Sequence, residues 1–257
     1  MNIQKYLLLG YICLLSLALS AQHYISAGAG INISFYQSAD MDLFEQSYNR
    51  INGAGLTEPL KGINNGAAGF RLLGSYHYLG KFYAGIGAGW QRSVIRDGAG
   101  YGNGEEREFV FTFSSLFSDI EFGATLDAYH IGGVAELAFQ RKIRIESSHN
   151  SRDTVLVKSL DGDYISDGLR SLHLGLSAGV LRPPLLINVK ILLPVYTSGE
   201  DKSLTDASAA KQAANTAEFP ADFDEYANQP TYTPMRSNIS SIRLVLSMSL
   251  ALPVFAR

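Results

Sequence analysis

Ionisable side chains occupy some of the polar positions in segments of this chain where apolar and polar residues alternate, and this placement limits the chemistry they can do. Residues two apart in a β-strand point to the same face of a sheet, so these charges gather on one side. Charges of both signs on a buried face must pair, because an unpaired buried charge is costly. A paired polar core is therefore favoured over the alternative, a path for protons or ions. The residues expected to form this polar network are Arg71, His77, Glu121, Asp127, Glu136, Lys142, His173, Lys190 and Arg243.

Patterns for catalysis and metal binding are weak in this sequence. His149 and Ser151 have the composition of the Ser–His pair of a lipid-modifying enzyme, but so short a match is expected by chance. Asp222, Asp224 and Glu225 offer oxygen ligands for a divalent cation, although a solvated acidic loop is the favoured interpretation. No His, Asp and Glu set has metal-ligand spacing, and no phosphate loop or dinucleotide motif occurs. The sequence predicts no enzyme, no cofactor and no metal site.

Eight segments alternate apolar with small or polar residues. From Ile25 to Phe35, every odd-numbered residue is apolar and every even-numbered one is small or polar. This is the period of a β-strand, and the segment is long enough for the 9–11 tilted residues, roughly, that cross a bilayer. The apolar faces are expected to contact lipid, among them Ile31, Leu72, Ile86, Leu137, Leu174, Val189 and Leu246. The expected strands cover residues 22–36, 66–79, 81–96, 118–129, 131–146, 168–182, 184–197 and 237–255.

Short and long connections alternate between these strands. Only a closed barrel of strands could place such a chain in a membrane, and short periplasmic turns opposite long extracellular loops are typical of outer-membrane barrels. A soluble β-sandwich, the alternative, has no reason to sort its loops in this way. The fold class predicted is therefore all-β, an eight-stranded antiparallel up-and-down transmembrane β-barrel with short periplasmic turns and long extracellular loops. The tight turns are expected at 79–81, 129–131 and 182–184, and the long loops at 37–65, 97–117, 147–167 and 198–236. Residues 108–117 either extend the fourth strand or form a hairpin with the end of the third.

The long loops are where binding is expected, because they are free of the constraints that the bilayer puts on the wall. The first loop has a helical pattern that begins after Ser38, a plausible N-cap, and the fourth has one over 206–217. The fourth loop is the longest, with an acidic excess and several aromatic residues. Its candidate interaction residues are Phe219, Phe223, Tyr226 and Tyr232.

The first 21 residues have the composition of an export signal. Lys5 precedes an apolar stretch at 6–19, and the small residues Ser20 and Ala21 suit cleavage. The division predicted is a signal peptide at 1–21 and a barrel domain at 22–257. Cys13, the only cysteine, lies in the signal, which excludes disulfides and a cysteine nucleophile from the mature chain. The long loops are acidic, which argues against nucleic acid as a partner.

These features together resemble the small eight-stranded outer-membrane barrels of Gram-negative bacteria, the OmpA-like and OmpX-like group. The resemblance rests on the signal, the strand rhythm, the glycine-rich stretches at 27–30 and 85–89 and the apolar last strand. It implies a location in the cell outer membrane, with outer-membrane lipid around the barrel. It also implies periplasmic chaperones and the barrel-assembly machinery as partners in biogenesis. That machinery reads a terminal aromatic residue in many members, and here Phe255 is followed by Ala256 and Arg257.

The function expected is a structural or surface-interaction role, in which long loops on a plugged barrel meet an unidentified surface protein or ligand. Two alternatives stay open. One is a narrow, porin-like channel for ions or small solutes, and the other, less favoured, is a lipid-modifying outer-membrane enzyme.

Overall fold

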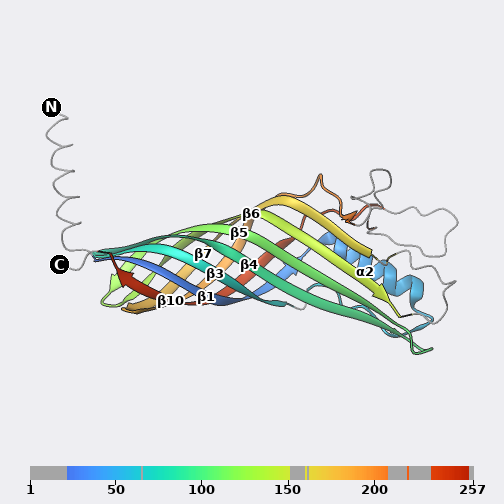
Figure 1. Ribbon diagram of the computed structural model, residues 1–257. Helices are drawn as coiled ribbons and strands as arrows, with labels where there is room; N and C mark the ends of the chain where they lie inside the picture. The colour runs from blue at the N-terminus through green and yellow to red at the C-terminus, as the bar shows by residue number, and fades with distance from the viewer. Residues whose placement is uncertain are drawn as a thin grey trace.

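Eight antiparallel strands close into a ring in the computed structural model, which describes residues 22–64, 66–150, 160, 162–207, 219 and 233–254 (Figure 1). The ring runs β1–β3–β4–β5–β6–β7–β8–β10 and closes where β10 pairs with β1. The short strands β2 and β9 attach to β4 and β7. The predicted eight-stranded antiparallel barrel is therefore confirmed. The elements are β1 (Gln22–Gln37), α2 (Ala39–Asn52), β2 (Leu56–Glu58), β3 (Ala67–Leu79), β4 (Phe82–Tyr101), β5 (Glu106–Leu126), β6 (Tyr129–His149), β7 (Gly162–Arg182), β8 (Leu185–Thr197), β9 (Thr205–Asp206) and β10 (Ser240–Pro253).

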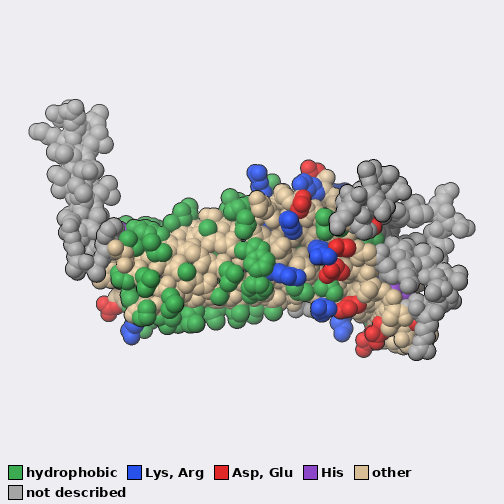
Figure 2. All heavy atoms as spheres, viewed as in Figure 1, with side chains coloured by type: hydrophobic (Ala, Val, Ile, Leu, Met, Phe, Trp, Pro, Cys, Tyr) green, Lys and Arg blue, Asp and Glu red, His purple; other side chains and the backbone are tan. Residues whose placement is uncertain are grey.

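An apolar belt covers the part of the barrel that carries the tight turns. Figure 2 shows it on one face, and exposed large apolar side chains occur on all eight barrel strands. The belt follows directly from the alternation in the strands, since each strand turns every second side chain outward. All seven residues expected to face lipid are between 40% and 58% exposed. Asn32 and Ser177, at positions that the alternation turns inward, are only 2% and 1% exposed. The inward and outward faces of the wall are thus those that the sequence predicts. Among the described residues, no helix is long and apolar enough to cross a membrane.

The two ends of the barrel differ in length and composition. Gly80–Lys81, Asp127–Ala128 and Pro183–Pro184 form the turns at one end, where β1 begins and β10 ends. Four strands extend further at the other end: β4, β5, β6 and β7 are 20 or 21 residues long in total, whereas the remaining barrel strands have 13 to 16 residues. The prediction of a long loop at 97–117 was wrong, because β4 and β5 stay paired from Phe82↔Ala124 to Gly100↔Glu106. Residues 108–117 therefore extend β5 and also form a hairpin with the end of β4.

The helix predicted in the first loop is confirmed as α2. Its N-cap is Ser38, whose side chain accepts a hydrogen bond from the Met41 backbone N–H (3.4 Å). The buried face of α2 packs against the inward side chains of the extended strands. This packing forms one apolar group, here called the mouth cluster, which includes Phe44, Tyr48, Phe109, Ile145, Tyr164 and Phe219. Apolar inward residues on β5 and β6 thus explain why these strands run beyond the belt.

Replacing Ile86 with Arg tests the belt directly. Ile86 is 53% exposed and lies in the middle of the belt segment of β4, so an arginine there should lower the free energy of unfolding by roughly 2–4 kcal/mol. Urea unfolding of protein refolded into lipid vesicles measures this cost. Leu43→Arg is the matched control, because Leu43 is 44% exposed on α2, outside the belt. Equal costs at the two positions would show that the belt is not in contact with lipid.

Candidate functional site: the interior of the barrel

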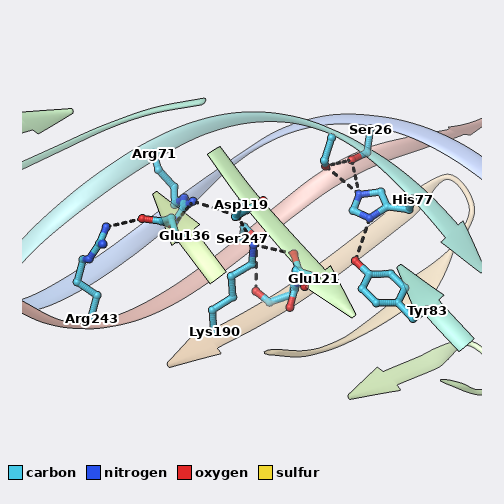
Figure 3. Close-up of polar contacts among 12 residues, drawn as sticks. Ser26, Arg71, His77, Tyr83, Asp119, Glu121, Glu136, Lys190, Arg243 and Ser247 are labelled. Atoms are coloured by element: carbon cyan, nitrogen blue, oxygen red, sulfur yellow. Dashed lines mark hydrogen bonds and ion pairs between the residues drawn. The ribbon is translucent and has the colours of Figure 1, made fainter. Parts of the chain in front are cut away.

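Six charged side chains fill the middle of the barrel and pair with one another (Figure 3). Glu136 from β6 accepts hydrogen bonds from Arg71 of β3 (3.0 Å) and Arg243 of β10 (2.7 Å). Lys190 of β8 contacts two carboxylates of β5, Asp119 (2.5 Å) and Glu121 (2.7 Å). A longer contact of 3.7 Å between Arg71 and Asp119 joins the two groups. Three cations therefore balance three carboxylates, and each of the six side chains is at most 4% exposed.

Neutral groups complete this central network. The Asn188 amide donates to both oxygens of Glu121, at 3.0 and 3.2 Å. The Arg71 guanidinium lies over the Phe117 ring, 3.8 Å from its centroid. Such contacts spread the charge of a buried ion and supply hydrogen bonds that water would otherwise make. The network is thus built from five strands, β3, β5, β6, β8 and β10, and its charges are compensated locally.

A second polar group lies nearer the turns and is centred on His77. Its Nε2 is 2.8 Å from the Ser75 hydroxyl and 3.1 Å from that of Ser26, while its Nδ1 is 2.9 Å from the Tyr83 hydroxyl. The Tyr83 ring in turn stacks on His130 with centroids 3.9 Å apart. His77 therefore has a hydroxyl at each ring nitrogen, the arrangement of a structurally held histidine.

Glycines on β4 make room for these side chains. A Cβ atom on Gly87 would lie 2.4 Å from a carboxylate oxygen of Asp119. On Gly85 it would lie 3.1 Å from both the His77 Nδ1 and the Tyr83 hydroxyl. The space that these glycines clear is thus taken by a carboxylate and by a His–Tyr pair.

Seven of the nine residues predicted for the polar network do lie inside the barrel, and two do not. Asp127 is in the β5–β6 turn with φ +55° and is exposed, so placing it in the lumen was wrong. Lys142 is also exposed, because the alternation of β6 shifts by one residue after Ala138. Gln140 has φ +48° at this bulge, and the pairing of β6 with both neighbours changes register there. A bulge adds one residue to a strand and reverses which side chains face inward beyond it.

The same bulge turns Arg141 inward, where it donates to the Ile239 carbonyl (2.7 Å). No sequence signal marks this residue as internal, since strict alternation assigns it to the outer face. Asp119 was also missed, although its parity is that of Glu121 and marks it as inward. His130 was assigned to a turn, but the turn is at Asp127–Ala128 and His130 is the second residue of β6.

A small cavity of about 30 Å³ lies between the central network and the mouth cluster. Its lining includes Asn32, Gln91, Arg141, His173 and Arg243. A polar cavity of this size can hold one or two water molecules, which would reach polar atoms of these side chains. His173, predicted as a network member, therefore contributes to the wall of this cavity.

The mouth cluster closes over the cavity at the loop end. Phe219 is fully buried there, with ring centroids 4.9 Å from Phe44, 4.7 Å from Tyr164 and 6.3 Å from Phe109. The prediction that Phe219 belongs to an exposed interaction surface was therefore wrong, since its ring is used to fold the loop end. Phe223, Tyr226 and Tyr232 lie outside the described residues, as does most of the helix predicted over 206–217.

A carboxylate at the loop end fastens the segment that follows α2. Asp97 accepts backbone N–H hydrogen bonds from Lys61 (2.9 Å) and Gly62 (2.8 Å). Burial raises the pKa of Asp97, and these hydrogen bonds oppose the rise. Burial also raises the pKa of Glu45, with Asp97 and Asp42 adding to the shift as neighbouring negative charges. Asp97 therefore holds the segment after α2 against the end of β4.

Of the catalytic and metal candidates, only His149 lies among the described residues. His149 lies 3.8 Å from Glu105 and packs edge-on against Tyr101, while Ser151 is not among the described residues. Asp222, Asp224 and Glu225 also lie outside them, and so do the predicted signal segment 1–21 and Phe255. The part of the chain that the structure describes holds no cluster of three or more metal-ligating side chains.

Comparison with known proteins adds little beyond the architecture. No protein-family model matches the chain, and no curated protein matches it. Among solved structures it is similar to Ail, the attachment invasion locus protein of Yersinia pestis, which was solved in complex with the heparin analogue sucrose octasulfate. The match covers 90% of this chain and 99% of that one, with a TM-score of 0.38 and 8% sequence identity. The class of protein follows instead from the closed ring, the belt and the compensated interior, which define an outer-membrane type of transmembrane β-barrel.

Proposed function

We propose that this chain is a non-enzymatic protein of the outer membrane, a sealed barrel that presents its loop end at the cell surface. The observation that carries the proposal is the interior, where three cations and three carboxylates pair in the middle of the barrel. An eight-stranded barrel is just wide enough for side chains to fill it. A lumen filled by ion pairs stabilises the barrel but offers no room for a ligand. Binding is therefore expected at the loop end, beyond the membrane.

The mouth cluster supports the sealed interpretation over the channel. Beyond the small cavity, Phe44, Tyr48 and Phe109 are at most 2% exposed and pack ring against ring. A solute crossing the barrel would have to part this apolar layer and then separate the central ion pairs. Both steps expose groups that are stabilised only by one another.

Single-channel recording tests the sealed lumen. Protein refolded into a planar bilayer should show no stable conductance, because ion pairs and the mouth cluster leave no continuous water path. Heat-modifiable migration in gels confirms that the recorded sample is a folded barrel. Steady porin-like currents from the folded protein would overturn the proposal in favour of the channel.

Cysteine labelling of intact cells tests the orientation. Cys13, the only cysteine, lies in the predicted signal, so single cysteines introduced elsewhere report on their own positions. Thr57→Cys, exposed on β2 at the loop end, should react with a membrane-impermeant maleimide. Lys81→Cys, exposed in a turn at the opposite end, should react only after the outer membrane is permeabilised. The reverse pattern would place the loop end in the periplasm.

The unidentified surface protein or ligand remains part of this proposal. The support is the length of β4–β7, which carry the wall well beyond the apolar belt and hold α2 and β2 there. A rigid, folded end of this kind is a scaffold on which loops can present binding residues. Phe223, Tyr226 and Tyr232 stay candidates for that role, whereas Phe219 does not.

A further inference from the structure

Three successive tiers of outward side chains on neighbouring strands form an ordered surface where the belt ends. The lowest tier is small, because Ala27, Gly74 and Ala88 are register partners across β1, β3 and β4. The next is apolar and aromatic: Leu72 pairs with Trp90, Trp90 with Leu116, and Leu116 with Phe139. The third places Arg92, Ser114 and Lys142 side by side on β4, β5 and β6. From the belt toward the loop end, apolar side chains are thus followed by cationic ones, as the acyl chains of a lipid are followed by its phosphate.

A shallow, open groove of about 540 Å³ lies along the lower two tiers on the outside of the wall. Its floor is formed by the small residues, and a Cβ atom on Gly74 would meet no atom closer than 3.9 Å. Leu72, Trp90 and Phe139 line it towards the loop end. The groove has apolar walls and faces the hydrocarbon region of the bilayer. It therefore fits an acyl chain of a surrounding lipid.

The cationic tier lies directly beyond this groove and lines a second hollow of about 790 Å³. Trp90 lines both, so the two hollows lie next to each other at this ring. Arg92 and Lys142 are exposed and make no ion pair with any residue that the structure describes. Their strands are separated by one strand, roughly 10 Å in all, so both long side chains can reach one anion above the Ser114 hydroxyl. Asp163 and Asp167 of β7 also line this hollow. Asp167 lies on the strand beside Lys142, at the bulge where Arg141 pairs with Leu169 and Ile143 with Ser166.

The charges above this tier are arranged differently. Arg144 is paired with Asp163 (2.5 Å) and Glu146 (3.1 Å), and Arg96 is paired with Glu108 (2.8 Å). Figure 2 shows this change on one face, with Lys and Arg side chains beside the belt and acidic ones interspersed further out. Arg92 and Lys142, which have no ion-pair partner among the described residues, thus lie where the belt ends and the lipid headgroups begin.

We propose that this surface binds one anionic, phosphate-bearing lipid of the leaflet at the loop end. Its phosphate lies between Arg92 and Lys142 with the Ser114 hydroxyl as a donor, and one acyl chain lies in the groove beside Trp90. The proposal concerns the outer wall and requires only that the barrel is in a membrane, so it is independent of the sealed lumen.

Trp90 is the only tryptophan of the chain, so its fluorescence reports on this surface alone. The protein is refolded into phosphatidylcholine vesicles that contain a minor fraction of brominated lipid, either phosphatidylglycerol or phosphatidylcholine. Bromine on the acyl chains quenches tryptophan on contact. Brominated phosphatidylglycerol should quench Trp90 at a lower mole fraction, corresponding to roughly a five-fold preference for each of the two cations. Raising the salt concentration should reduce this preference.

Two variants and a matched control decide the origin of the preference. Arg92→Gln with Lys142→Gln should bring quenching by the two lipids to the same level. Ser114→Asp, which places a carboxylate between the cations, should do the same with both cations still present. Lys81→Gln with Arg182→Gln removes the same charge from exposed positions at the turn end and should leave the preference unchanged.

Gly74→Leu tests the groove, since it fills the floor and leaves the cations in place. It should weaken quenching of Trp90 by brominated phosphatidylglycerol, with heat-modifiable migration verifying the fold. Equal quenching of the unsubstituted protein by the two lipids would overturn the proposal. A preference that survives in both the Arg92/Lys142 variant and Ser114→Asp would overturn it as well.

Discussion

Replacing Glu136 with Gln is expected to lower the free energy of unfolding by about 3–5 kcal/mol, a loss typical of breaking a buried ion pair. Glu136 is fully buried and is the only carboxylate within hydrogen-bonding distance of both Arg71 and Arg243 among the described residues. The amide keeps the shape of the side chain but removes its charge, so two buried guanidinium groups lose their shared partner. Urea unfolding in lipid vesicles, followed by tryptophan fluorescence, measures the change.

The expected cost comes from the uncompensated cations, and this can be tested separately. Adding Arg243→Met to Glu136→Gln should recover part of the lost stability, because one of the two unpaired charges is removed. Glu108→Gln is the matched surface control, since the Arg96–Glu108 pair is largely exposed and such pairs contribute at most about 1 kcal/mol. A loss no larger than that of Glu108→Gln would show that the interior is hydrated enough to screen its charges.

Replacing Phe109 with Ala is expected to cost about 3–5 kcal/mol of the stability of the loop end. Phe109 is fully buried in the mouth cluster, and its ring contacts those of Phe44, Tyr48 and Phe219. Removing it leaves a cavity where β5 meets α2. Hydrogen exchange of the α2 amides should become faster, since the helix is held to the barrel mainly by these rings.

The membrane part should respond differently to the same substitution. The belt and the central network do not depend on Phe109, so heat-modifiable migration should persist. Phe122→Ala is the control, because Phe122 is 62% exposed on the belt and lipid can fill the space it leaves. Slow exchange in α2 of the Phe109 variant would show that the mouth cluster contributes little to holding the helix.

The number of strands, their facing and the first-loop helix could be predicted because each depends on local spacing. Alternation with a period of two assigns Ile31 outward and Asn32 inward wherever a strand is regular, since neighbouring side chains must point to opposite faces. The same reasoning places Arg71, Glu136, Lys190 and Arg243 in the interior. A bilayer outside and a narrow lumen inside leave these charges only one another as partners. The sequence of the strands therefore determined the wall and the composition of its interior.

The partners within that interior, and the limits of the strands, were decided by the tertiary structure. Strand register determines that Arg71 and Arg243 share Glu136. The two arginines are 65 and 107 positions from Glu136 in the sequence, so they reach it only when the ring closes. The bulge at Gln140 exchanged Lys142 for Arg141, because one added residue in β6 reverses the facing beyond it. Phe219 was assigned to an exposed loop, although its ring is buried by Phe44 of α2 and Tyr164 of β7, which are far from it in the sequence. Local spacing holds no information on such contacts, which exist only once the chain has folded.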